Sequence, residues 1–411
     1  METSHLKQAG SWKRNAALFL GGQSLSMFGS MLVHYAITWH VTLKTQSGSV
    51  MTLFAIAGVL PMFFLSPFGG VWADRYNRKY LINISDAVIA AVTLVMALLF
   101  FAGFDNIGLL FICAVVRAAG QGVQTPAVNA IIPEIVPEEH LTKINGINST
   151  VQSLCMFAAP MASGALLAFA PIEGILFIDA VTAAIGISLV FFFVRVPPRQ
   201  RSEAAASAVD YFRDIKEGLL YVAKYPFIRR FLLISALFCI MAAPMVMLTP
   251  IQVTRNFGTD IWMLTAIELA FSIGMMLGGV VIGFWGGFKN KAYTMTLANV
   301  VFGAVSIALG LVGNFWVYLA CMLVCGFSMP MFNTPVTTIF QSKVDADYMG
   351  RVFSVMTMIS SVMMPLGMVI FGPLGDIISI DYILIGTGAV IFLSSFLIAG
   401  SKAIREAGAA N

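Results

Sequence analysis

A succession of long apolar runs constrains this chain more than any other feature of its sequence. These runs, free or nearly free of charge, extend over residues 15–43, 45–73, 80–104, 106–133, 144–172, 174–194, 231–254, 261–288, 292–342, 352–375 and 382–401. A helix of about 20 residues crosses a hydrocarbon core of about 30 Å, so each run can span a bilayer, and 292–342 can span it twice. Only 11% of the residues are charged, against about 25% in soluble domains. We therefore predict an all-α integral membrane protein with twelve transmembrane helices.

The distribution of Lys and Arg predicts how these helices are oriented. If the N-terminus lies in the cytoplasm, all of the 24 basic residues except Lys44, Arg117 and Arg255 lie on the cytoplasmic side. Twelve spans then place both termini in the cytoplasm. The net charge of +4 thus reflects topology, and we expect no nucleic-acid partner.

A single long polar stretch, residues 196–230, divides the helices into two sets of six. We predict an N-terminal half at 1–200, a cytoplasmic linker at 201–228 and a C-terminal half at 229–411. Within the linker, residues 210–224 have the pattern of an amphipathic surface helix.

A charged turn, GGVWADRYNRKY at 69–80, lies between the second and third apolar runs. We expect its first two glycines to let neighbouring helices approach closely. Its charges form a candidate cytoplasmic gate. The residues of this gate motif are Gly70, Asp74, Arg75, Arg78 and Lys79.

The second half of the chain repeats features of the first. GFWGGFKNK at 283–291 is a weaker copy of the charged turn, in which Gly287 replaces the acid. Thr125-Pro126 corresponds to Thr334-Pro335, and Ala159-Pro160 to Met364-Pro365. Internal duplication is typical of transporters that place one substrate site between two related halves.

Four charged residues lie inside predicted spans: Asp86, Arg117, Asp179 and Glu268. Insertion of a charge at the centre of a membrane costs about 2.5–3.5 kcal/mol, so each is a candidate for proton coupling. Asp86 and Asp179 could each form a permanent ion pair with Arg117 instead. Glu268 is the only acid deep within the second half, where protonation from one side of the membrane could drive exchange.

Polar side chains at helical spacing predict the walls of a substrate cavity. Arg117 is followed at one-turn intervals by two glutamines, and a later helix carries amides at similar intervals. The first helix has methionines and a histidine along one side. The candidate cavity residues are Met27, Met31, His34, Gln121, Gln124, Asn145, Asn148 and Gln152. The alternative is that the amides form only interhelical hydrogen bonds.

These motifs resemble the major facilitator superfamily over nearly the whole chain. GGVWADRYNRKY is similar to its signature between helices 2 and 3, with Asn77 in place of the usual glycine, and Asn tolerates left-handed turns. The resemblance implies that Gly70, Asp74 and Arg78 help to hold the two halves together on the cytoplasmic side. Arg117 with Gln121-Gly122 is similar to the family's helix-4 arginine motif, with one extra residue.

One further segment resembles an antiporter motif of this superfamily, and two more resemble its macrolide-efflux branch of proton-coupled drug exporters. APMASG at 159–164 is similar to an antiporter motif in which two glycines are replaced, and the other two segments are 125–153 and 350–367. This branch implies alternating-access export of lipophilic or amphipathic compounds in exchange for protons. Related branches export siderophores, lysolipids or metabolites, and this alternative stays open.

The sequence favours a transporter over other classes of membrane protein. The four histidines are scattered without metal-binding spacing, and no Gly-Lys dipeptide forms a phosphate-binding loop. We therefore expect no enzyme activity, no metal and no cofactor, although a transporter-like sensor remains an alternative. The expected partners are a small lipophilic substrate, protons and the lipid bilayer. We expect a multi-pass monomer in the plasma membrane, which in a bacterium is the cytoplasmic membrane.

Overall fold

The computed structural model describes residues 2–196, 220–222 and 224–409, and these residues form helices joined by short turns. Twelve of the helices in these ranges are long and apolar enough to cross a membrane. The prediction of an all-α protein with twelve spans is thus confirmed. The orientation of the termini remains a prediction, and most of the predicted linker lies outside the described residues.

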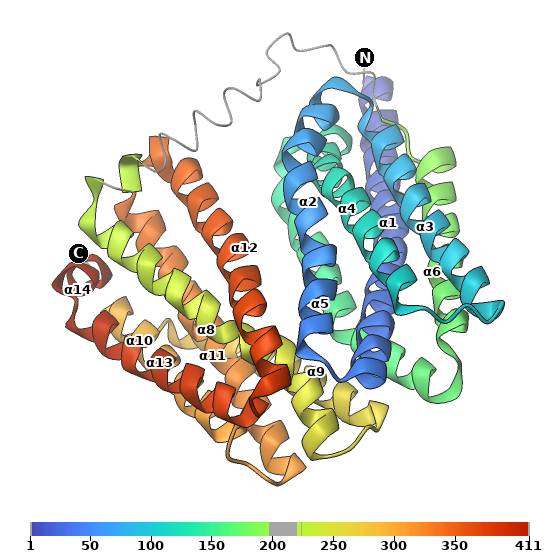
Figure 1. The fold of residues 1–411 in the computed structure, drawn as a ribbon. Helices are drawn as coiled ribbons and strands as arrows, with labels where there is room; N and C mark the ends of the chain where they lie inside the picture. The colour runs from blue at the N-terminus through green and yellow to red at the C-terminus, as the bar shows by residue number, and fades with distance from the viewer. Residues whose placement is uncertain (1, 197–219, 223, 410–411) are drawn as a thin grey trace. The chain divides into compact units, whose positions relative to one another are not determined.

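The chain divides into two compact units, which contain residues 1–40 with 54–208 and residues 41–53 with 209–411. Helices of the first unit run along most of its length (Figure 1). They are α1 (Glu2–Thr45), α2 (Gly48–Arg75), α3 (Arg78–Phe101), α4 (Ile107–Ile135), α5 (Glu138–Phe169), and α6 (Ile172–Ser188), which continues into the π-helix η1 (Leu189–Phe193). The end of α1 and the start of α2 belong to the second unit.

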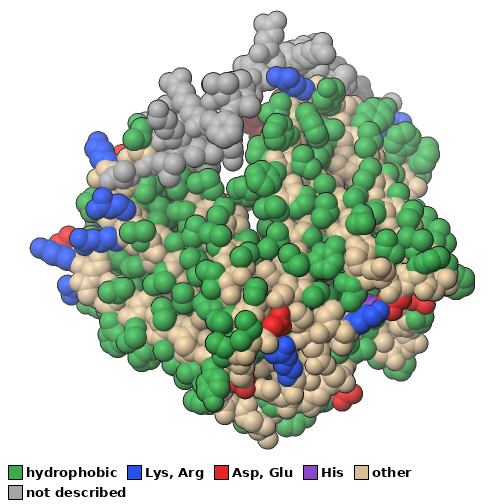
Figure 2. All heavy atoms as spheres, viewed as in Figure 1, with side chains coloured by type: hydrophobic (Ala, Val, Ile, Leu, Met, Phe, Trp, Pro, Cys, Tyr) green, Lys and Arg blue, Asp and Glu red, His purple; other side chains and the backbone are tan. Residues whose placement is uncertain are grey.

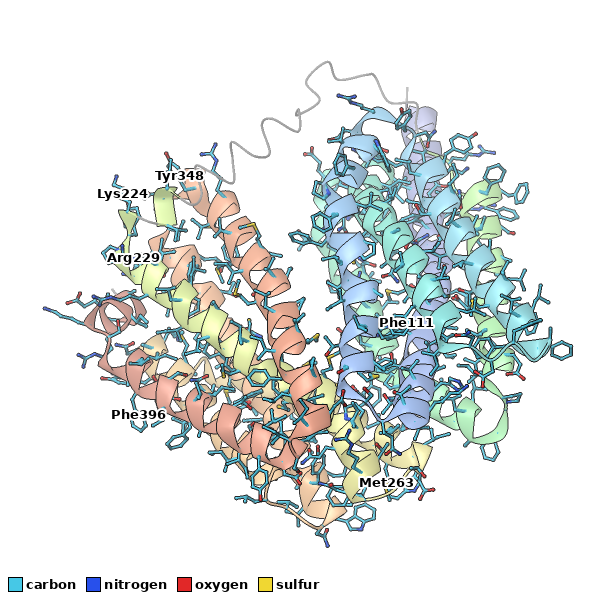
Figure 3. The ribbon with its side chains drawn as sticks, viewed as in Figure 1. Phe111, Lys224, Arg229, Met263, Tyr348 and Phe396 are labelled. Atoms are coloured by element: carbon cyan, nitrogen blue, oxygen red, sulfur yellow. The ribbon has the colours of Figure 1, made fainter. Side chains whose placement is uncertain are left out.

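The second unit contains the remaining six spans and one short helix. These are α8 (Pro226–Asn256), α9 (Ile261–Trp285), α10 (Lys291–Leu309), α11 (Phe315–Lys343), α12 (Ala346–Ile377), α13 (Ile380–Gly400) and α14 (Lys402–Gly408). Figure 3 shows Lys224, Arg229 and Tyr348 at one end of this unit and Met263 at the other. The starts of α8 and α12 therefore lie opposite the start of α9, as alternating spans require.

The prolines of the sequence repeat occupy corresponding helices of the two units. Pro126 lies inside α4 and Pro335 inside α11, which are the fourth span of each set of six. Pro160 lies inside α5 and Pro365 inside α12, the fifth span of each set. Each proline removes one backbone donor from its helix and favours a local bend at an equivalent position.

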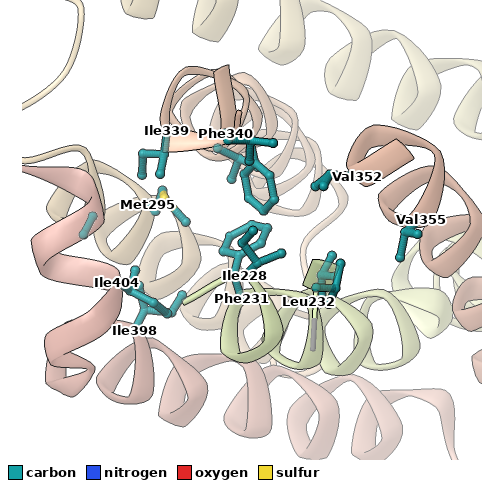
Figure 4. Packing of buried hydrophobic residues seen from close by; sticks show 14 of the residues in the cluster. Ile228, Phe231, Leu232, Met295, Ile339, Phe340, Val352, Val355, Ile398 and Ile404 are labelled. Atoms are coloured by element: carbon teal, nitrogen blue, oxygen red, sulfur yellow. The ribbon is translucent and has the colours of Figure 1, made fainter. Parts of the chain in front are cut away.

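Each unit has its own apolar core. In the second unit, Phe231 of α8 contacts Phe340 of α11, with ring centroids 5.1 Å apart, and Ile404 of α14 joins the same cluster (Figure 4). In the first unit, the corresponding cluster includes Phe19 and Ile131. Apolar side chains also cover most of the face seen in Figure 2, as expected for a surface in contact with lipid.

Glycines allow two pairs of helices to pack with their backbones in close contact. A Cβ on Gly69 would lie 2.6 Å from the carbonyl oxygen of Gly122, so α2 and α4 require glycine there. The adjacent Gly70 has no atom within 4 Å of such a Cβ, so only one of the two glycines in the charged turn serves this purpose. In the second unit, Gly274 and Gly278 of α9 meet the backbone of α11 in the same way.

A carboxylate caps the first turn of α2 within the second unit. Asp376, near the end of α12, accepts hydrogen bonds from the backbone nitrogens of Gly48 at 2.6 Å and Ser49 at 2.9 Å, and from the Ser47 hydroxyl at 2.9 Å. Arg255 of α8 lies 3.7 Å from the same carboxylate. The free donors at this helix start are therefore satisfied by a residue more than 300 positions away.

Candidate functional site

A buried ion pair lies in the interior of the first unit. Arg117 of α4 donates to the carboxylate of Asp179 on α6, and their side chains are 7% and 0% exposed. Arg117 also donates to the hydroxyl of Thr93 on α3 and to the backbone carbonyl of Ser30 on α1, the latter at 3.0 Å. The guanidinium on α4 is thus held by three other helices, and its charge is balanced by Asp179.

Asp86 of α3 occupies a different environment in the same unit. Its Oδ1 accepts from Ser26 Oγ at 3.1 Å and from Gln124 Nε2 at 2.6 Å, and its Oδ2 accepts from Gln23 Nε2 at 3.2 Å. No ion pair that involves Asp86 occurs in the described part of the chain. The carboxyl group is therefore buried among neutral donors, and we call Gln23, Ser26 and Gln124 the donor cage.

Helical spacing explains how α1 and α4 reach both acids. Ser26 and Ser30 are one turn apart on α1, and Ser30 Oγ donates to Asp179 at 3.2 Å. Arg117 and Gln124 are two turns apart on α4, so one contacts Asp179 and the other Asp86. The structure thus resolves which acid pairs with Arg117, a choice that the sequence left open.

Glycines bring α1 against α6 beside this network. A Cβ on Gly29 would lie 2.0 Å from Thr182 Oγ1 and 3.3 Å from Asp179 Oδ1. Two turns away, a Cβ on Gly22 would lie 3.1 Å from the carbonyl oxygen of Gly186. The serine face of α1 reaches the acids because small residues permit this approach.

Glu268 lies in the second unit, on α9, and is partly buried. Within the described ranges it takes part in no hydrogen bond or ion pair. Three of the four predicted membrane charges, Asp86, Arg117 and Asp179, therefore lie in the first unit, whereas Glu268 belongs to the second.

The candidate cavity residues differ in burial. Gln124 contacts Asp86 and lies 3.4 Å from Gln23 Oε1, so it belongs to the donor cage. Met27, Met31, Gln121 and Asn148 are partly buried. The remaining three candidates, His34, Asn145 and Gln152, are exposed in the structure.

The charged turn is organised around Arg78. This side chain lies 3.2 Å from Asp74 of α2 and 3.0 Å from Glu134 of α4, and it donates to the Ala73 carbonyl at 2.9 Å. Lys79 donates to the Val194 carbonyl at 2.7 Å. Arg78 therefore joins three helices of the first unit at the predicted cytoplasmic end.

Asn77 has a different role in this turn from the one its left-handed tendency indicated. Its φ is −66° and its ψ is 115°, and its side chain accepts from the backbone nitrogen of Lys79 at 3.0 Å. The residue is thus an N-cap of α3, for which Asn is among the preferred residues. Asn77 therefore does not use the left-handed conformation that Asn tolerates.

Sequence reasoning missed Gln23, Ser26, Ser30 and Thr93. The first three are polar residues at spacings of three and four in an otherwise apolar helix, which is the signal that identified Gln121 and Gln124 on α4. Thr93 gave no such signal in the sequence. A threonine in a helix can satisfy its hydroxyl with a carbonyl of its own helix, as Thr93 does with Ile89, so its presence did not require a partner on another helix. Its contact with Arg117 depends on how α3 packs on α4.

A surface groove of about 370 Å³ lies elsewhere on the first unit, and its lining includes none of the candidate site residues described above. Its lining is almost entirely apolar: Val181, Ala184, Ile185, Ser188, Leu189 and Phe193. A groove of this composition on a transmembrane helix is suited to lipid contact.

Comparison with known proteins agrees with this architecture. The family model of the Major Facilitator Superfamily matches residues 16–368. Macrolide efflux protein A of Streptococcus pyogenes is 27% identical over 403 residues, which cover 98% of this chain and 99% of that protein. The protein of the same name from Enterococcus faecalis is 28% identical over 324 residues, covering 78% of this chain and 100% of that one. Among solved structures, the nucleoside transporter NupG aligns with a TM-score of 0.72 at 15% identity, over 93% of this chain and 98% of that one.

Proposed function

The chain belongs to the Major Facilitator Superfamily, and from that premise we propose that it is a secondary active exporter of lipophilic, macrolide-like drugs. Protons enter in exchange for the substrate, and the two halves alternate access to a central cavity. The named macrolide efflux proteins, which align over nearly their full length, support the class of substrate. The solved structures support the fold alone.

The proposal of proton coupling rests on the contrast between the two buried acids of the first unit, Asp86 and Asp179. Asp179 forms an ion pair with Arg117, so the charge of its carboxylate is balanced within the unit. Asp86 is equally buried yet is held by neutral donors. A buried carboxyl group without a counter-ion can exchange a proton without leaving an unpaired cation behind.

Glu268 is the second proposed proton carrier. It lies within a span of the other unit, and an ionisable residue at membrane depth is a functional candidate by default. Arg117 acts in this scheme by holding Asp179, Thr93 and α1 together, and the charged turn around Arg78 acts as the cytoplasmic gate.

The test is export of a labelled macrolide from proteoliposomes that contain the purified protein, with and without an imposed pH gradient. We expect movement that depends on the gradient. Asp86→Asn should remove most of the dependence on the gradient while substrate binding persists, and Glu268→Gln should weaken this dependence more than it weakens substrate binding. Asp381→Asn is the matched control, because Asp381 also accepts from two amides, Gln252 and Asn256.

The outcomes separate the proposal from its alternatives. Absence of macrolide movement in both conditions would contradict the substrate class and direct the search to siderophores, lysolipids or metabolites. Movement that is independent of the pH gradient but follows a sodium gradient would contradict proton antiport.

A further inference from the structure

We propose that Gln23, Ser26 and Gln124 form a proton-responsive clamp, which ties α1 and α4 to Asp86 when this carboxylate is ionised and releases them when it is protonated. This inference depends on the proposed proton antiport only in giving the clamp a role in transport. The contacts that carry it lie within the first unit and involve residues that no motif assigns to coupling.

The chemistry of the three partners makes the clamp sensitive to the charge of Asp86. Each donates a hydrogen bond to the carboxylate: Gln124 and Ser26 to Oδ1, and Gln23 to Oδ2. A carboxylate accepts all three, whereas a protonated acid becomes a donor at one oxygen and cannot accept there in the same way. At least one partner must then turn away or present an acceptor.

When the amide group of Gln23 or Gln124 rotates, its carbonyl oxygen can become the acceptor for the protonated Asp86. Gln124 Nε2 already lies 3.4 Å from Gln23 Oε1, so the two side chains are neighbours as well as partners of Asp86. When a proton binds to Oδ1 or Oδ2, the new O–H group can donate to a glutamine carbonyl or to Ser26 Oγ. The charge-assisted bonds are lost in this exchange, and neutral bonds of about half their strength replace them.

The electrostatic surroundings allow Asp86 to respond separately from the ion pair. The charged groups that face it are Asp179 on α6, whose charge acts on Asp86, and Arg117 on α4, which is bound to Asp179. From α1 the acid is met by Gln23 and Ser26, which are neutral. Neutralisation of Asp86 therefore changes its hydrogen bonds while the Arg117–Asp179 pair keeps its counter-charge.

The first helix is the element that transmits the change. Gln23 and Ser26 hold one stretch of α1 to Asp86, and the next turn is held to Asp179 and Arg117 through Ser30. Gly22 and Gly29 lie on the same face of α1 as Ser26, and there α1 meets Gly186 and Thr182 of α6. Release of the clamp thus removes the bonds from Gln23 and Ser26 to Asp86, while the Ser30 contact and the close packing on α6 stay in place.

Met27, a candidate cavity residue, directly follows Ser26 on α1. A change in the position of Gln23 and Ser26 would therefore move this side chain of the predicted cavity. Proton binding at Asp86 and substrate binding are coupled in this way without any contact between the substrate and the acid.

The experiment is a carboxyl titration by infrared difference spectroscopy on the purified protein in nanodiscs. The band that disappears in Asp86→Asn is assigned to Asp86. Gln23→Met and Gln124→Met keep the side-chain length but remove a donor to the carboxylate, so each should move the midpoint of this band to higher pH. A hydrogen bond to a charged group contributes about 1.5–3 kcal/mol, which corresponds to a displacement of about one to two pH units.

Asn256→Met is the matched control, because it removes an amide that donates to Asp381 in the other unit. It should leave the Asp86 midpoint unchanged. If a glutamine variant does not fold, Ser26→Ala provides the same test with a smaller change. An Asp86 band that does not titrate, or a midpoint that is the same in wild type and in the folded cage variants, overturns the clamp.

Export assays on the same variants separate this inference from the proposed function. Proton-driven macrolide export with an unmoved Asp86 midpoint would overturn the clamp and leave the proposed function standing. A displaced midpoint in the cage variants, together with no proton-driven export by the wild type, would support the clamp and overturn the proposed function.

Discussion

At the scale of single residues, the first unit contains two buried acids with opposite surroundings. Asp179 and Arg117 neutralise each other, whereas Asp86 depends on three neutral donors. Loss of one partner from a buried ion pair leaves an unpaired charge, whereas loss of both leaves an apolar site. Single and double mutants of the Arg117–Asp179 pair can therefore separate its contribution to protein stability from its contribution to export.

Arg117→Ala and Asp179→Asn should each abolish export and destabilise the protein by about 3–5 kcal/mol, because each leaves one buried charge uncompensated. The double variant Arg117→Met/Asp179→Leu should recover much of that stability but no export. Thermal unfolding in nanodiscs and proteoliposome export measure the two effects. Normal export by folded Arg117→Ala would exclude a transport role for the arginine.

At the scale of elements, glycines determine which helices come into backbone contact. Gly274 and Gly278 are four residues apart on α9, and a Cβ at either would lie within 2.2 Å of a carbonyl oxygen of α11. Gly326 presents the reciprocal contact from α11. Small residues at this spacing are typical of close helix packing in membranes.

Gly278→Leu should separate α9 from α11 and destabilise the protein by about 1–3 kcal/mol or more, since the added side chain meets backbone that cannot move aside. Gly279→Leu, one residue further on, is the matched control because a Cβ there has no atom within 4 Å. Thermal stability of both variants in nanodiscs checks the prediction. Equal stability would mean that the helices tolerate a wider separation.

The cap on α2 gives a second prediction at this scale. Asp376→Ala removes the acceptor for the Gly48 and Ser49 amides, and loss of a capping side chain costs about 0.5–2 kcal/mol. Both amides should exchange with deuterium about tenfold faster or more. Asp260→Ala serves as the control, because Asp260 occupies the N-cap of α9 without a side-chain capping bond. Unchanged exchange at residues 48–50 would count against the cap.

At the scale of the whole molecule, the orientation in the membrane is the property that most needs a test. Lys402 on α14 and Asp260 before α9 are both exposed, and the Lys and Arg distribution puts them on opposite sides of the bilayer. Lys402→Cys should react with a membrane-impermeant maleimide only in inside-out vesicles, and Asp260→Cys only in right-side-out vesicles. The reverse pattern would invert the predicted topology.

The sequence by itself determined the class of this protein, its twelve spans and its family, because hydrophobic length and local motifs act within short stretches of chain. Charge within the apolar runs identified Asp86, Arg117 and Asp179 as candidates, and helical spacing identified Gln124. It could not decide that Arg117 pairs with Asp179, since the two acids lie on different helices and differ from Arg117 in depth by similar amounts. That choice depends on glycine contacts such as Gly29 with Thr182, which bring α1 and α6 together. Only tertiary packing decides which donors surround each carboxylate, and therefore which acid is free to carry a proton in the proposed mechanism.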